Sequence, residues 1–376
     1  MSRTAPTTSR RAFLRGGLAV GAVSALSSCA YIPDDAPAVA PLPRSAKAKV
    51  DGDLGYFNWA DYLDPSVLKG FQKEYGVKII ESNFDSMEGM YAKIAAGNQY
   101  DIVFPIAKWV VKMRREGRLR AIDHEQLDNA DQVFYSGSYF NDPWYDPGSR
   151  VSVPFTVYKT GIGWRTDKIG SMTGSWRDLW NIEGAGRIFT LDDQDEALAM
   201  AALLLGYDVN TAKPSHLDEM RKLLVSQKKY LRAYSSDDIN NMTSGDAWIH
   251  HMWSGDFLYM REGLAKNKAT FDFEAPEEGA PINSDTYAIP ANARHPGTAM
   301  LFIDYLLRPE NAVKNINYLY YPFPVRDAVG AFQDLAKEVP ACDVDVADLE
   351  NPDVFRLLDP AAVQRRTATW TEVKAS

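Results

Sequence analysis

The chain has 376 residues, of which 41 are Lys or Arg and 50 are Asp or Glu, so its formal net charge at pH 7 is -9. This negative charge argues against a nucleic-acid partner and favours cationic small molecules. Only 2 cysteines are present, which excludes a disulfide framework, and the length is sufficient for two domains.

The first 28 residues have the features of an export signal. The pair Arg10-Arg11 precedes a modest apolar stretch over residues 16–26, and small residues then lead to Cys29. The arginine pair resembles a twin-arginine signal, and Leu-Ser-Ser-Cys resembles a lipobox, so we predict export followed by lipidation of Cys29. The apolar stretch is shorter than the roughly 20 residues of a membrane-spanning helix, which disfavours a transmembrane anchor. The protein is therefore expected on the periplasmic or extracellular face of the cell membrane, held there by lipid.

Residues 29–48 are rich in Pro and Ala and are predicted to form a semi-extended tether, with order beginning near Val50. Removal of residues 1–28 would take away four arginines and no acid, which changes the net charge from -9 to -13. Lipidation of Cys29 would also leave Cys342 without an intramolecular partner.

Strands and helices then alternate along the chain. Residues 54–59 are strand-like, and Asp64-Pro65 is typical of the start of a helix that ends before Gly76. Further strands are predicted over residues 77–80 and 100–104, and further helices over residues 86–96 and 109–116. This alternation predicts a mostly parallel sheet covered by helices on both faces.

The same alternation begins again after Phe155. Strands are predicted over residues 161–164 and 187–191 and helices over residues 196–205 and 217–227, followed by a strand over residues 287–290 and a helix over residues 299–307. The apolar run 197–205 is too short to cross a bilayer and is interpreted as a core helix. We therefore predict two α/β lobes, one formed by residues 49–156 with 287–324 and the other by residues 157–286 with 325–376.

Common catalytic and metal-binding motifs are absent from the sequence. It contains no Gly-x-Ser-x-Gly, His-Glu-x-x-His, Gly-x-x-x-x-Gly-Lys or Cys-x-x-Cys motif. The adjacent His250 and His251 would point to opposite faces of a strand, so a structural role is favoured over metal binding. The acidic run 192–196 lacks the glycine and the spaced terminal Glu of a calcium loop. The sequence therefore predicts no metal, no cofactor and no enzymatic activity.

Acidic residues instead lie beside aromatic residues near the predicted ends of strands. Trp59 is followed by Asp61 and Tyr62, Trp253 is followed by Asp256, Asp193 and Glu196 lie between a strand and a helix, and Asp285 opens a strand. Ligands bind at the carboxyl ends of strands in open α/β sheets, so most of these positions are expected to converge. Carboxylates and aromatic faces together favour a ligand with separated ammonium groups on an apolar stem. For any single residue, a helix cap or a core position remains the alternative.

With these residues in place, the chain resembles the periplasmic polyamine-binding proteins, the substrate receptors of spermidine/putrescine ABC transporters. The resemblance extends from about Leu54 to the end of the chain. The segments that carry it are Phe57-Asn58-Trp59-Ala60-Asp61-Tyr62, Met90-Tyr91-Ala92-Lys93, Tyr100-Asp101-Ile102-Val103, Lys112-Met113-Arg114-Arg115-Glu116-Gly117, Trp176-Arg177-Asp178-Leu179-Trp180, Ala288-Ile289-Pro290-Ala291-Asn292-Ala293, Leu306-Leu307-Arg308-Pro309 and Arg365-Arg366-Thr367-Ala368-Thr369-Trp370-Thr371.

The resemblance implies a two-lobed periplasmic-binding-protein fold with a ligand cleft between the lobes. It implies a monomer that captures putrescine or spermidine and delivers it to an ABC permease. The residues that match the family's binding positions are Trp59, Asp61, Tyr62, Asp193, Glu196, Ser236, Trp253, Asp256, Asp285 and Tyr321.

The chain also departs from the family at several of these positions. Ala60 and Ile106 replace hydroxyl residues, and Asn283 replaces an aromatic wall. Lys108 adds a positive charge where a cation should bind. Lys108 either turns outward or pairs with a surplus acid, or it occupies one end of the cleft and shortens the ligand or meets a carboxylate on a zwitterion.

Two alternatives to a polyamine receptor remain open at this stage. The same fold can bind another organic cation or a zwitterion, as Lys108 and Asn283 suggest, or a metal complex. A secreted hydrolase that uses two carboxylates as acid and base is the third possibility. If the carboxylates hold the ligand, affinity should fall as the pH approaches their ordinary pKa range near 4.

Overall fold

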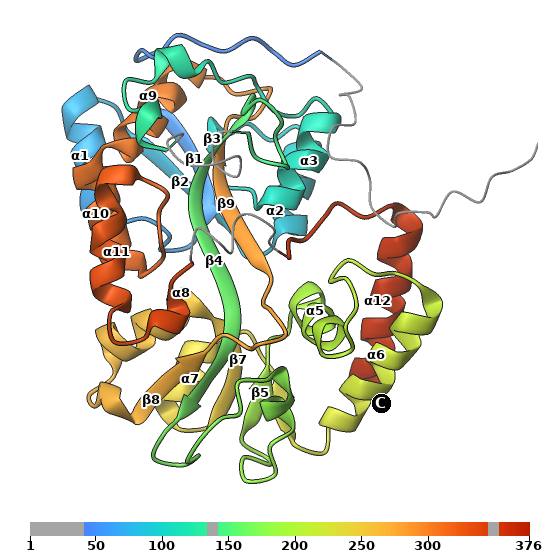
Figure 1. Cartoon of the computed structure of the whole chain (residues 1–376). Helices are drawn as coiled ribbons and strands as arrows, with labels where there is room; N and C mark the ends of the chain where they lie inside the picture. The colour runs from blue at the N-terminus through green and yellow to red at the C-terminus, as the bar shows by residue number, and fades with distance from the viewer. Residues whose placement is uncertain (1–40, 134–141, 345–352) are drawn as a thin grey trace, which may run out of the picture.

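A computed structural model describes residues 41–133, 142–344 and 353–376 (Figure 1). The predicted export signal, the predicted lipidation site Cys29 and residues 29–40 of the predicted tether lie outside the described residues. Within the described part of the chain, no helix has the length and the apolar character needed to cross a membrane.

The upper lobe in Figure 1 begins with alternating strands and helices whose ends follow local sequence signals. The Asp64 side chain accepts a hydrogen bond from the Ser66 backbone N–H at 2.7 Å, and Gly76 adopts the left-handed conformation after the helix. The Ser86 side chain caps the next helix in the same way. The elements are β1 (Leu54–Trp59), α1 (Pro65–Tyr75), β2 (Ile79–Phe84), α2 (Met87–Ala95), β3 (Ile102–Val103) and α3 (Ala107–Arg115). The prediction was correct for β1 and α1, whereas β2 lies further along the chain than residues 77–80 and β3 is shorter than residues 100–104.

The lower lobe contains a second set of strands and helices. The predicted core helix is confirmed, because residues 197–202 of α5 are all buried. The elements are β5 (Ile188–Thr190), α5 (Gln194–Leu204), α6 (Pro214–Gln227), β6 (Leu231–Tyr234), α7 (Asp238–Ser244), β7 (Ile249–Trp253), α8 (Ser254–Leu258), β8 (Phe271–Glu274) and the C-terminal α12 (Pro360–Ala375).

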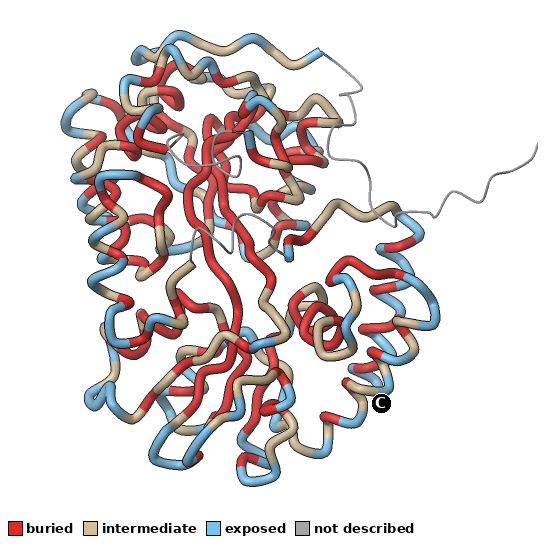
Figure 2. Tube along the Cα trace, in the orientation of Figure 1, coloured by how far each residue is buried: buried red, intermediate tan, exposed pale blue. Residues whose placement is uncertain are grey.

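Two long antiparallel strands connect the lobes. β4 (Ser152–Arg165) and β9 (Ile282–Ala288) run side by side through the middle of the molecule in Figure 1. Figure 2 shows both strands as largely buried, and every residue of β4 except Arg165 is buried. The sequence predicted only residues 161–164 of β4, and it placed Asp285 at the start of a strand. Asp285 instead lies in the middle of β9, so that prediction was wrong; contacts with both neighbouring strands extend β9 beyond what local residue preferences indicate.

In the part of the chain that the structure describes, the strands form one 9-stranded sheet in the order β2-β1-β3-β9-β4-β7-β5-β6, and β8 pairs with β4. The pairs β1–β2, β1–β3, β5–β6 and β5–β7 are parallel, as the alternation of strands and helices predicted. The pairings made by β4 and β9 are antiparallel. The two-lobed α/β fold is therefore confirmed, and the connecting strands supply its antiparallel part.

The remaining helices pack on the upper lobe. α9 (Pro296–Leu307) and α10 (Pro309–Leu319) contact α1, and α11 (Val329–Ala336) contacts α10. The predicted lobe boundaries at residues 156/157, 286/287 and 324/325 remain predictions.

Residues 42–48, which the sequence assigned to the tether, pack on the body. The Ala121 N–H donates to the Pro43 carbonyl at 2.9 Å, the Asp123 N–H donates to Ser45 Oγ at 2.9 Å, and Leu42 packs against the upper-lobe core. The folded body therefore begins before the predicted Val50, because main-chain hydrogen bonds hold a segment with few large apolar side chains.

Candidate functional site

One face of three neighbouring strands carries a row of polar and aromatic side chains. Alternate residues of a strand point to the same face, and directly paired residues on neighbouring antiparallel strands share that face. The three pairs on this face are Thr156 with Asp285, Tyr158 with Asn283, and Thr160 with Trp253. This register brings residues of β9 and β7, two segments distant in the sequence, together along β4.

The first part of the site is the carboxyl group of Asp285. Its Oδ2 accepts hydrogen bonds from Tyr62 Oη at 2.7 Å and from Thr156 Oγ1 at 2.9 Å. Its Oδ1 is buried and has no hydrogen-bond partner in the described residues. Burial raises the pKa of Asp285 to about 6, although the two hydrogen bonds oppose this rise. A buried carboxylate with a free oxygen is suited to receive a cationic donor.

The second part is the carboxyl group of Asp256, at the start of α8. Tyr321 Oη donates a hydrogen bond to Asp256 Oδ1 at 2.7 Å, and burial raises the pKa of Asp256 to about 6. Burial and the neighbouring charge of Asp256 also raise the pKa of Asp238, which is 2% exposed. A Cβ on Gly255 would lie 2.4 Å from the Tyr321 ring, so only glycine leaves room for this ring.

Aromatic rings connect these two acids. The Tyr321 ring centroid lies 6.2 Å from that of Tyr62 and 5.5 Å from that of Tyr158, both in edge-to-face geometry. Tyr62 and Tyr321 each hold one acid through the hydroxyl group and contribute a ring to the same cluster. Such rings can cover a methylene chain and attract a cation.

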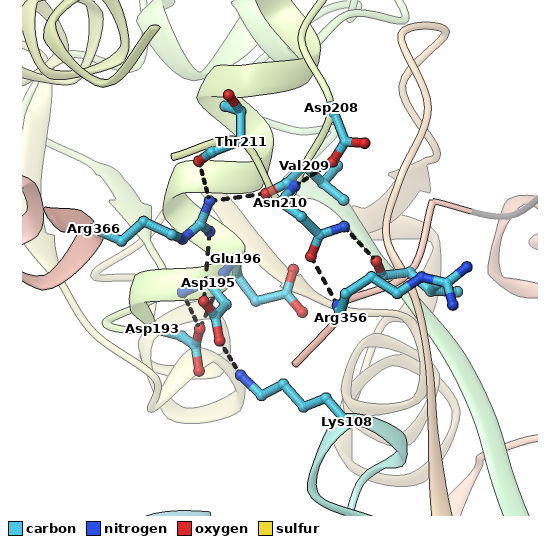
Figure 3. Close-up of polar contacts among 11 residues, drawn as sticks. Lys108, Asp193, Asp195, Glu196, Asp208, Val209, Asn210, Thr211, Arg356 and Arg366 are labelled. Atoms are coloured by element: carbon cyan, nitrogen blue, oxygen red, sulfur yellow. Dashed lines mark hydrogen bonds and ion pairs between the residues drawn. The ribbon is translucent and has the colours of Figure 1, made fainter. Parts of the chain in front are cut away.

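The third part is the acidic N-terminus of α5 (Figure 3). Asp193 caps this helix, because its Oδ1 accepts hydrogen bonds from the backbone N–H groups of Asp195 and Glu196 at 2.8 and 3.0 Å. Glu196 is 4% exposed and accepts a hydrogen bond from Thr160 Oγ1 at 2.9 Å. Burial and the neighbouring acids raise the pKa of Asp193 and Glu196 above their ordinary values. The helix cap, which the sequence leaves open as the alternative to a binding role for Asp193, is therefore present, and the binding role of Asp193 remains a prediction.

Two basic residues pair with Asp195 at this helix end. Lys108 Nζ from α3 forms an ion pair with Asp195 Oδ2, and Arg366 Nη2 from α12 lies 3.5 Å from Asp195 Oδ1 (Figure 3). Burial disfavours the charged form of Asp195, but the two cations outweigh this effect and lower its pKa to about 2. Lys108 therefore pairs with one of the surplus acids, as one of the two interpretations of the sequence expected.

The other predicted binding residues are partly or fully exposed to solvent. Trp59, at the end of β1, packs against Phe84 with a ring separation of 4.6 Å and remains partly exposed. Asp61 is exposed and adopts the left-handed backbone conformation with φ 53. Burial raises the pKa of Tyr318, and the negative charge of Asp61 adds to this rise. Ser236 is also exposed. Binding roles for these residues remain predictions.

Several residues that build the site were missed from the sequence. Thr156, Tyr158 and Thr160 supply one face of β4, and Asp195 and Asp238 add carboxylates to the two ends. The β-branched and aromatic residues over 155–158 are an available signal for β4. In the sequence, Asp195 is recognisable only as part of the acidic run 192–196, which resembles a calcium loop superficially.

His250, His251 and Cys342 are buried and pack within the core of the protein. His250 stacks on Phe189 and His251 packs against Trp176, and burial lowers their pKa values to about 4 and about 3. Cys342 is buried and is not in a disulfide. Among the residues that the structure describes, no group of three His, Cys, Asp or Glu side chains is arranged to hold a metal ion.

Comparisons with known proteins identify a matching family and several similar proteins. The model of the bacterial extracellular solute-binding protein family matches residues 66–342. The chain is 34% identical over 288 residues to a spermidine/putrescine-binding periplasmic protein of Salmonella typhimurium, a match that covers 75% of this chain and 81% of that protein. It is 28% identical over 344 residues to a putrescine/cadaverine-binding protein of Pseudomonas aeruginosa, covering 89% of this chain and 96% of the relative.

A solved structure shows the same fold. The spermidine/putrescine ABC transporter substrate-binding protein of Streptococcus pneumoniae superposes with a TM-score of 0.76 at 27% identity. The superposition covers 86% of this chain and 99% of that structure.

Proposed function

The chain belongs to the family of bacterial extracellular solute-binding proteins, and on this premise we propose that it captures a polyamine, putrescine or spermidine, for an ABC transporter. The observation that carries the proposal is the buried Asp285 carboxyl group, which has one free oxygen and lies in a cluster of tyrosine rings. An ammonium group supplies the positive charge and the hydrogen-bond donors that this oxygen lacks.

The roles of the site residues follow from their chemistry. Asp285 and Asp256 accept hydrogen bonds from ammonium groups, and the rings of Tyr62, Tyr321 and Trp253 cover the methylene stem. Trp59 completes the site from a partly exposed position and Asp61 and Ser236 from exposed positions, while Asp193 and Glu196 form its far end. The ligand is bound through ion pairs and ring contacts, and no bond is made or broken.

The two lobes provide a way to enclose the ligand. Substrate-binding proteins of this architecture close by a hinge motion, and the hinge here is formed by the segments that cross between the lobes, including β4 and β9. The closed protein is then delivered to the membrane permease of the transporter. We propose that it acts as a monomer, exported by its twin-arginine signal and attached to the membrane by lipid at Cys29.

The raised pKa values of Asp256 and Asp285 set the pH at which binding should weaken. From the sequence, affinity was expected to fall near pH 4, but burial raises the pKa of both Asp256 and Asp285 to about 6. Binding of a cation requires the charged carboxylates, so the loss of affinity should begin near pH 6.

A thermal-shift panel on the body that starts after Cys29 tests the proposal. Putrescine, spermidine, spermine, an amino acid and a simple anion are each added at saturating concentration. A ligand at 100 times its dissociation constant stabilises the folded state by about 2.7 kcal/mol, which gives a clear rise in the melting temperature. The proposal predicts a rise with at least one of the three amines, and no response to any of them would refute it.

A further inference from the structure

An ion pair joins the two lobes at the far end of the candidate site. Lys108 extends from α3 in the upper lobe and reaches Asp195 at the N-terminus of α5 in the lower lobe (Figures 1 and 3). The two residues are 87 positions apart in the sequence. The side chains of Lys108 and Asp195 are 20% and 25% exposed, so water screens this pair less than a surface pair.

Arg366 fixes the position of the acid in this pair. The Arg366 side chain is 1% exposed, and its Nη1 donates hydrogen bonds to the carbonyl groups of Val209 and Thr211, both at 3.0 Å. Its Nη2 lies 3.5 Å from Asp195 Oδ1, opposite the oxygen that Lys108 contacts. Asp195 is therefore held between a fixed guanidinium group and a lysine that comes from the other lobe.

The positive charge of Lys108 reaches beyond Asp195. It favours the ionised forms of Asp193 and Glu196 as well, so it acts on all three carboxyl groups at this helix end. Lys108 and Arg366 both pair directly with Asp195, and they offset part of the negative charge at this helix end. A ligand ammonium group that reached Asp193 or Glu196 would meet the positive charge of Lys108.

The opposite end of the site has no such compensation. Asp238, Asp256 and Asp285 form no ion pair with Lys or Arg in the described residues, and their hydrogen bonds come from neutral groups such as Tyr62 and Tyr321. Asp285 Oδ1 is buried and has no hydrogen-bond partner in the described residues, and the Asp238 side chain lies within hydrogen-bonding reach of Asp256. The uncompensated negative charge therefore lies at the Asp256–Asp285 end.

We infer that Lys108 acts as a built-in ammonium group that occupies the α5 end of the site, so that the protein selects a short diamine over a longer triamine. This inference rests on the proposed function and names the substrate class within it. Lys108 is then a specificity-determining residue, and it contributes this selectivity only when α3 and α5 are close together.

The spacing of the contact residues along β4 also favours a short diamine over a longer triamine. Thr156 contacts Asp285 and Thr160 contacts Glu196, and these two threonines are four residues apart on one strand. Four residues of an antiparallel strand span about 13 Å. A triamine is long enough to place an ammonium group near Glu196, where it would meet Lys108, whereas a short diamine stays beside Asp256 and Asp285.

Substitution of Lys108 tests the inference by the ratio of two affinities. Putrescine and spermidine are titrated calorimetrically into the wild type, Lys108→Met and Lys108→Arg. Lys112→Met is the matched control, because Lys112 lies one turn later on α3 and pairs within the upper lobe with Glu116. Melting temperatures without ligand verify that each variant is folded.

Loss of the lysine charge should improve spermidine binding relative to putrescine binding by on the order of tenfold or more, since a desolvated like charge is removed. Lys108→Arg and Lys112→Met should keep the wild-type ratio. An unchanged ratio in a folded Lys108→Met variant that still binds putrescine would overturn the inference and leave the proposed function intact. Loss of both affinities in that folded variant would also overturn it, because Lys108 would then be required for binding. If the wild type binds neither amine, the proposed function fails and the inference fails with it.

Discussion

Replacement of Asp285 by Asn separates a ligand-binding acid from a structural acid. Asp285 is 1% exposed, and burial raises its pKa from 3.8 to about 6. The protonated acid stabilises the fold below about pH 4, and this contribution is lost as the pH rises through about 6. The change in pKa corresponds to about 3 kcal/mol of unfolding free energy between these limits.

The Asn side chain keeps the shape of Asp and carries no charge. Its amide oxygen can still accept hydrogen bonds from Tyr62 and Thr156, whereas its amide nitrogen replaces the unpartnered Oδ1, which costs about 1–2 kcal/mol. We therefore expect the ligand-free Asp285→Asn variant to be about 1–2 kcal/mol more stable than the wild type at pH 8. This advantage should disappear at pH 4.

The same substitution should weaken binding. Removal of the charge from a buried ion pair typically costs about 3 kcal/mol, or roughly 150-fold in the dissociation constant of the amine. Urea denaturation without ligand at pH 4 and pH 8, together with calorimetric titration at pH 8, measures both effects. Asp192→Asn is the control, because Asp192 is an exposed acid that pairs with Lys374, and it should leave affinity within about twofold. A stability at pH 8 that falls together with affinity would refute the reasoning, as would an affinity within threefold of the wild type.

Two further predictions follow from the same groups. Affinity for an amine should be constant above about pH 7 and should fall as the pH drops through about 6, since Asp256 and Asp285 both have pKa values raised to about 6; calorimetric titrations between pH 5 and pH 8 measure this, and a midpoint near pH 4 would contradict it. Gly255→Ala should weaken binding by at least tenfold, since the added Cβ would lie 2.4 Å from the Tyr321 ring and displace it. Gly330→Ala, where a Cβ meets no atom within 4 Å, should leave affinity unchanged and raise the melting temperature; equal affinities in the two variants would show that the ring position is unimportant.

Local signals in the sequence predicted the parts of the fold that local interactions determine. Asp64, Ser86 and Gly76 mark helix ends through contacts with residues a few positions away, so α1 and α2 were placed within one or two residues. The extents of β4 and β9 depend on strand pairing between positions more than a hundred residues apart. Residue preferences within a short window cannot supply that information.

In the candidate site, too, features that depend on local sequence are predictable and features that depend on distant residues are not. The types of the acids and aromatic residues are recognisable in the sequence, and a helix cap at Asp193 is one of the two alternatives that it offers. Which acids carry a compensating cation was not predictable, because Lys108 and Arg366 reach Asp195 from helices far away in the sequence. That pairing decides which end of the site still needs a ligand charge.

Direct titration of putrescine and spermidine into the purified body at pH 8 tests the central claim. The account predicts saturable binding of one amine per protein molecule, release of the amine chemically unchanged after denaturation, and a loss of affinity below pH 6. No heat of binding with either amine, or conversion of the amine to another compound, would contradict it.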